Sequence, residues 1–90
     1  MSPTKIALSS LALDLRRVAL GYHRHSKEMA ERFFDEALKR KEEIDKSQVK
    51  PYINNLLLKL ESLKLEKRDE DKAENALMYS TLFQNAAVQL

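Results

Sequence analysis

A stripe of mostly apolar side chains recurs at alternating steps of three and four residues through the first third of the chain. Its members are Leu8, Leu11, Leu15, Val18, Tyr22, His25 and Met29. This is the spacing with which one helix packs along another, so the segment is predicted to be an α-helix with a buried seam. Gly21, the only glycine, lies beside the seam and does not shift its phase.

The seam favours one long helix over residues 3–45. Ser2 followed by Pro3 is a favourable helix start, and Lys50 before Pro51 is pushed away from helical angles. A glycine inside a helix costs about 1 kcal/mol relative to alanine, whereas a break would interrupt the phase of the stripe. We therefore expect the helix to continue through Gly21.

Such a helix would be about 60 Å long at 1.5 Å per residue, roughly twice the length that the remaining helical segments can cover. Half of the seam would then need a second chain, and we expect an antiparallel homodimer through these seven positions. The alternative is a chain that folds back near Gly21 into a four-helix monomer, with a polar pocket near His23 and His25.

Two shorter helices are predicted after the first one, over residues 49–67 and 72–89. The main stripe of the earlier helix is Ile53, Leu56, Leu60 and Leu63, with Leu58 and Leu65 on its opposite side. The last helix carries one charged residue after Lys72, and Asp71 with Glu74 resembles a capping box at its start. The fold class is all-α, with residues 1–90 as a single three-helix domain.

Composition narrows the function classes further. Residues 1–25 carry four cationic side chains and one acidic side chain, and the net charge of +2 is too small to indicate nucleic acid by itself. The chain has no cysteine, which fits a reducing compartment, and no segment has the roughly 20 apolar residues of a membrane span. We expect a cytoplasmic protein without a membrane partner.

Candidate catalytic or metal-binding residues are few. His23 and His25 are two positions apart, about 200° around a helix, so they cannot bind one metal ion there, and no cofactor is expected. Arg17 and His23 have a spacing similar to the Arg-x(4–6)-His signature of HEPN-type ribonucleases, which are helical dimers. The resemblance covers seven residues, and Val18 departs from the usual polar residue, so we predict no enzyme activity.

The remaining features favour a non-enzymatic interaction or adaptor module, a homodimer that binds another protein. The candidate partner-binding residues are Tyr79, Leu82, Phe83, Val88, Leu58 and Leu65. The alternative function is a small nucleic-acid-associated regulator that uses a basic flank on the first helix. That flank consists of Arg16, Arg17, Arg24 and Lys27.

Overall fold

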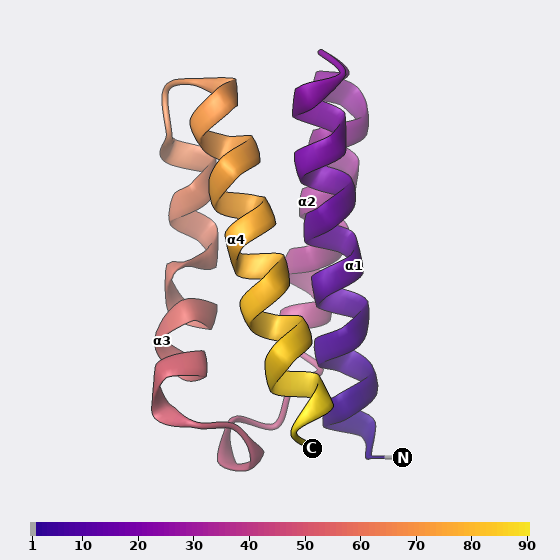
Figure 1. The fold of residues 1–90 in the computed structure, drawn as a ribbon, viewed down its shortest axis with the longest axis vertical. Coiled ribbons are helices and arrows are strands. Elements are labelled where there is room, and N and C mark those ends of the chain that lie inside the picture. The colour runs from indigo at the N-terminus through magenta and orange to yellow at the C-terminus, as the bar shows by residue number, and fades with distance from the viewer. Residues whose placement is uncertain (1) are drawn as a thin grey trace.

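The structure is a computed structural model that describes residues 2–90, and every regular element in that range is helical. The four α-helices run alternately up and down the bundle (Figure 1): α1 (Pro3–His23), α2 (Lys27–Lys41), α3 (Pro51–Lys59) and α4 (Asp69–Val88). Two 3-10 segments, η1 (Lys46–Gln48) and η2 (Leu60–Leu65), precede and follow α3. The predicted all-α class is confirmed.

The prediction of one helix over residues 3–45 is wrong, because α1 ends at His23 and α2 begins at Lys27. The longest dimension of the molecule is 35 Å, too short for a helix of that length. The Ser26 N–H donates to the Gly21 carbonyl at 2.8 Å and the His25 N–H donates to the Tyr22 carbonyl at 3.1 Å. These two bonds form a Schellman motif that ends α1, with His25 in its left-handed position at φ 59°. The chain therefore adopts the predicted alternative with a break near Gly21.

Helix α1 is the centre of the core and packs against both α2 and α4 (Figure 1). Leu8, Leu11, Leu15 and Val18 are fully buried, and Tyr22 is nearly so. Helices of the same chain cover these side chains. No half of the seam is therefore left exposed in this fold, and an exposed half was the reason to expect a second chain. The seam also ends at the turn, where His25 is exposed and Met29 is partly exposed.

Helices α1 and α4 are joined by a buried polar contact as well as by apolar packing. The Ser80 hydroxyl donates to the Ala12 carbonyl at 2.8 Å. Within α4, the buried rings of Tyr79 and Phe83 form an edge-to-face pair with their centroids 6.2 Å apart. The hydrogen bond from Ser80 to Ala12 and the apolar packing hold α1 and α4 side by side and thereby fix the surface between them.

The other helix boundaries differ from prediction in two places. The helix expected over residues 49–67 is α-helical only to Lys59 and continues as the tighter η2 to Leu65. Helix α4 begins three residues early, with Arg68 as its N-cap and three acidic residues in its first turn, so the capping box expected at residues 71–74 does not form. Acidic side chains there interact favourably with the positive end of the helix dipole. The predicted start of α1 is confirmed, because the Ser2 hydroxyl accepts from the Lys5 N–H at 3.1 Å.

Candidate functional site

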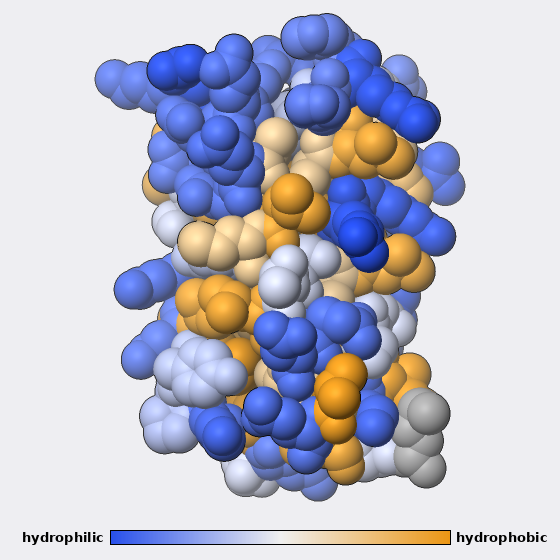
Figure 2. All heavy atoms as spheres, in the orientation of Figure 1, coloured by the Kyte–Doolittle hydropathy of each residue, from blue (hydrophilic) through white to orange (hydrophobic). Residues whose placement is uncertain are grey.

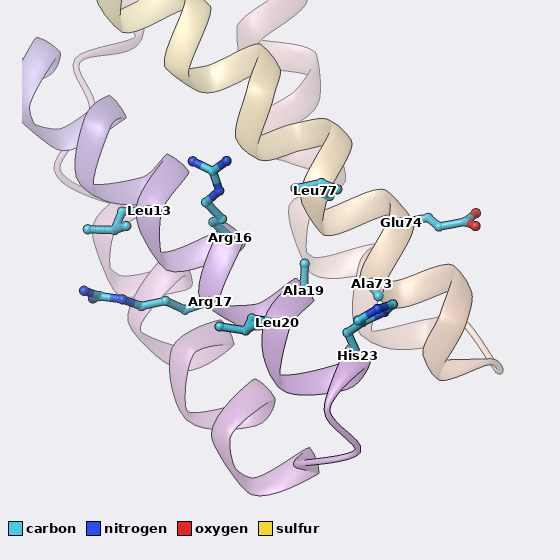
Figure 3. Close-up of a pocket in the computed structure, with 9 residues that line it drawn as sticks. All are labelled: Leu13, Arg16, Arg17, Ala19, Leu20, His23, Ala73, Glu74 and Leu77. Atoms are coloured by element: carbon cyan, nitrogen blue, oxygen red, sulfur yellow. The ribbon is translucent and has the colours of Figure 1, made fainter.

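An apolar groove lies on the outer surface between α1 and α4 (Figure 3), with a volume of about 570 Å³. Leu13 and Leu20 of α1 and Leu77 of α4 line it and are between 39% and 48% exposed. Two small side chains, Ala19 and Ala73, lie between the helices and leave the surface hollow. Figure 2 shows apolar surface along the middle of this face, with hydrophilic surface at the upper end of the bundle. The groove therefore offers half-buried leucines on both sides of a shallow channel.

The groove residues Leu13 and Leu20 belong to a second apolar stripe on α1 that the sequence reasoning missed. Ile6, Leu13 and Leu20 recur every seven residues, and Ile6 is 50% exposed. Because these positions are out of phase with the buried seam, they lie on the outer face of α1. The heptad spacing was the available signal, but seven of the twelve residues between the three positions are also apolar, so the stripe is less evident than the seam.

The groove continues along α4 as a smaller hollow of about 210 Å³. The two hollows share Leu13, Arg16 and Leu77, and the second one extends to Gln84 and Asn85. Together they span residues 12–23 of α1 and 73–85 of α4, which is about 18 Å at 1.5 Å per residue. This length accommodates about three turns of another helix.

Two arginines give the α1 side of the groove a positive charge. The Arg17 guanidinium lies 5.2 Å from the centroid of the Phe33 ring of α2, a cation–π distance that orients its side chain. Among residues 2–90, no carboxylate lies within 4.0 Å of the Arg16 guanidinium. Figure 3 shows Arg16 between α1 and α4, whereas the carboxylate of Glu74 points away from the groove.

The single acidic residue of α1 lies away from the groove. The Asp14 carboxylate is buried against α2, with its Oδ2 atom 3.8 Å from Nε of Arg40. Burial raises the pKa of Asp14 above its ordinary value, although the positive charges of Arg40 and Arg17 partly oppose the shift. The outer face of α1 therefore presents cations without a compensating acid of its own.

The predicted partner-binding residues separate into two groups. Tyr79 and Phe83 belong to the core, with 9% and 0% exposure, and Leu82 is half-buried. Tyr79 and Phe83 are therefore not available to a partner in this fold. The remaining three are at the surface but outside the groove: Val88 on α4, and Leu58 and Leu65 on α3 and η2, which are 65% and 80% exposed.

The predicted basic flank is only partly gathered in one place. Arg16 and Arg17 line the groove, whereas Arg24 caps α1 and Lys27 opens α2 beyond it. The Lys27 ammonium lies 3.9 Å from Oδ2 of Asp69, so its charge is partly compensated.

A polar pocket near the two histidines, expected for the fold with a break, is present at the end of the bundle. It has a volume of about 760 Å³, and its lining includes His23, His25, Asp69 and Glu70. Within residues 2–90, His, Cys, Asp and Glu side chains form no group of three that would hold a metal ion. The pocket carries no defined chemistry of its own.

Comparison with protein-family models, with curated proteins and with solved structures yields no match for this chain. Within residues 2–90, no helix has the length and apolar character needed to cross a membrane. The interpretation of function therefore depends on the groove and its charges.

Proposed function

We propose that this chain is a non-enzymatic interaction module of the cytoplasm that binds a helix of another protein in the α1–α4 groove. The observation that carries the proposal is the channel itself, with Leu13, Leu20 and Leu77 half-exposed around two alanines. Helix-in-groove recognition uses such channels, which receive apolar anchors spaced one and two turns apart on the partner. The length of about three turns is sufficient for these anchors.

The observations favour a protein partner over the alternative of nucleic acid. A phosphate backbone is recognised by clustered cations, but the surface between Arg16 and α4 is mainly apolar. Single-stranded nucleic acid is bound through exposed aromatic side chains, but within residues 2–90 the exposed aromatic side chain is Tyr52, which lies on α3 away from the groove. The groove is thus better suited to leucine-like anchors than to bases.

The test is photo-crosslinking in the cells that produce the protein, with a benzophenone amino acid placed singly at Leu20 or Leu77. Matched controls carry the same group at Leu58 or Leu65, which are more exposed than either groove position. Nonspecific adhesion would therefore label the controls more strongly. We expect one defined adduct with a different protein from the groove positions and none from the controls.

Three other results would contradict the proposal. The first is the absence of any adduct from the groove positions. The second is stronger labelling from Leu58 and Leu65, which would place the partner on α3 and η2. The third is an adduct with twice the mass of the chain, which would mean that a second copy occupies the groove. That result would restore the predicted homodimer on a different surface from the seam.

A further inference from the structure

We infer that the groove selects an acidic amphipathic helix whose carboxylates contact Arg16 and Arg17. This inference depends on the proposed function and specifies the chemistry of the partner. Apolar anchors of that helix would contact Leu13, Leu20 and Leu77, and its acidic flank would face α1. The inference is drawn from the distribution of charge around the groove.

The two walls of the groove differ in charge. On α1, Arg16 and Arg17 lie beside the leucines, while Asp14 is buried against Arg40 on α2. On α4, residues 75–90 include no charged side chain, so the wall that faces the arginines is neutral from Asn75 onward. A bound helix therefore meets positive charge on the α1 flank, whereas the α4 flank has Glu74 at one end and uncharged side chains from Asn75 onward.

Arg16 is the residue best placed to recognise a carboxylate. It lines both hollows of the groove, and none of the ion pairs formed within residues 2–90 includes it. Because an arginine presents several donors in a planar fork, it binds a carboxylate with defined geometry. The Arg17 guanidinium is restrained over Phe33 of α2, and Figure 3 shows it pointing away from α4, so it adds a second charge at the outer edge of the α1 wall.

The same distribution of charge disfavours a second copy as the occupant. Four of the five charged residues within residues 1–25 are cationic, and two of them line the groove. Packing the outer face of α1 against itself would bring arginines together without local acids, and like charges in contact are unfavourable. An acidic helix removes this repulsion.

The inference is tested with three side-chain-bridged helical peptides of about 15 residues that share one apolar face. The flanking positions carry Glu in the first, Gln in the second and Lys in the third. Fluorescence anisotropy gives the Kd of each for the intact protein at low and high salt. We expect the Glu peptide to bind about fivefold more tightly than the Gln peptide at low salt, with the Lys peptide weakest, and the differences to shrink at high salt.

Arg16→Glu should remove the preference for the Glu peptide or reverse it. Arg24→Glu is the matched control, because it changes net charge equally but lies outside the groove. Circular dichroism confirms that both variants remain helical. An equal effect of the two variants would overturn the inference, because the preference would then reflect net charge alone.

Other results separate this inference from the proposed function. Equal binding of all three peptides at both salt concentrations overturns the acidic preference and leaves the helix-binding groove intact. Absence of binding by every peptide contradicts both proposals. A duplex DNA probe that binds more tightly than the Glu peptide at the same salt would overturn the inference in favour of nucleic acid.

Discussion

A Cβ atom at Gly21 would lie 2.7 Å from the backbone nitrogen of Ala30 and 2.9 Å from its Cα atom. Helices α1 and α2 therefore meet at a distance that only glycine permits at this position. The φ of Gly21 is not positive, so the residue is required for close approach and not for conformational freedom. This contact lies beside the turn at residues 24–26 and allows α2 to fold back directly along α1.

Gly21→Ala should destabilise the protein by about 2 kcal/mol, because the added methyl group contacts backbone atoms that cannot rotate away. This direction opposes the gain of up to about 1 kcal/mol that alanine gives inside an isolated helix. Urea denaturation of the wild type and the variant measures the difference in the free energy of unfolding.

Gly21→Ala combined with Ala30→Gly is the control. The second substitution removes the Ala30 Cβ atom, which lies 3.0 Å from the position of the added methyl group, but leaves the closer backbone atoms in place. The new glycine at residue 30 itself costs stability because of its low helix propensity. After this cost is subtracted, we expect the double variant to recover only part of the stability that Gly21→Ala loses. A Gly21→Ala variant more stable than the wild type would contradict the close contact between Gly21 and Ala30.

His25→Gly should stabilise the protein by about 1 kcal/mol. His25 has φ 59°, and the left-handed conformation is unfavourable for a residue with a Cβ atom. The motif that ends α1 requires this conformation at its C′ position, where glycine is most common. Thermal unfolding followed by circular dichroism measures the change.

The matched control is His23→Gly, at the last residue of α1. Glycine inside a helix lowers stability, so this variant should lose up to about 1 kcal/mol. A gain of stability for His25→Gly and a loss for His23→Gly would locate the end of α1 between these two residues. A loss of stability in both variants would show that residue 25 is still helical.

The buried seam was predictable from sequence, whereas the break in the helix was predicted only as the alternative to a continuous helix. Leu8, Leu11, Leu15 and Val18 have the spacing of a packed face, and each is fully buried. The position after the helix end that adopts the left-handed conformation is usually glycine, but here it is His25, so the sequence lacks the usual signal for a helix end. The other determinant of the break, the contact of Gly21 with Ala30, forms only after the chain has folded back, so a local pattern does not contain it.

The candidate site was predicted less well than the fold. From Asn75 onward helix α4 has no charged side chain on any side, so its sequence does not distinguish a core face from an exposed face. The sequence therefore offers Phe83 as a candidate partner-binding residue although it is fully buried, and it does not point to Leu77, which is 48% exposed. Only the packing of α4 on α1 determines which side is covered.

Asp14 should make the protein less stable as pH rises from acid toward neutral. Burial raises its pKa in the folded state, so the folded protein binds a proton more tightly than the unfolded chain does. The free energy of unfolding therefore falls between the ordinary pKa and the raised pKa, and the penalty is fully present above the raised pKa. Asp14→Asn should lack this fall, as urea denaturation across that pH range would show.

Asp45 provides the control of opposite sign. Its carboxylate accepts hydrogen bonds from the Ser47 hydroxyl and the Ser47 backbone N–H, which lower its pKa. Its contribution to stability is therefore present above the ordinary pKa and lost as pH falls through the lowered value. Asp45→Asn should remove a rise of stability with pH. If Asp14→Asn and Asp45→Asn changed the pH dependence of the free energy of unfolding in the same direction, burial would not be the dominant effect on the pKa of Asp14.

Leu77→Asp should leave the protein folded, whereas Phe83→Asp should unfold it. Truncating a buried phenylalanine alone costs about 3–5 kcal/mol, and an unpaired carboxylate in that space adds to the loss. The total approaches the whole stability expected for a domain of this size, about 5–13 kcal/mol. Leu77 lies in the groove and is half-exposed, so its loss should stay near 1 kcal/mol. Circular dichroism and sedimentation velocity distinguish the two outcomes. Unfolding of the Leu77→Asp variant would mean that Leu77 belongs to the core and that the groove is not an open binding surface.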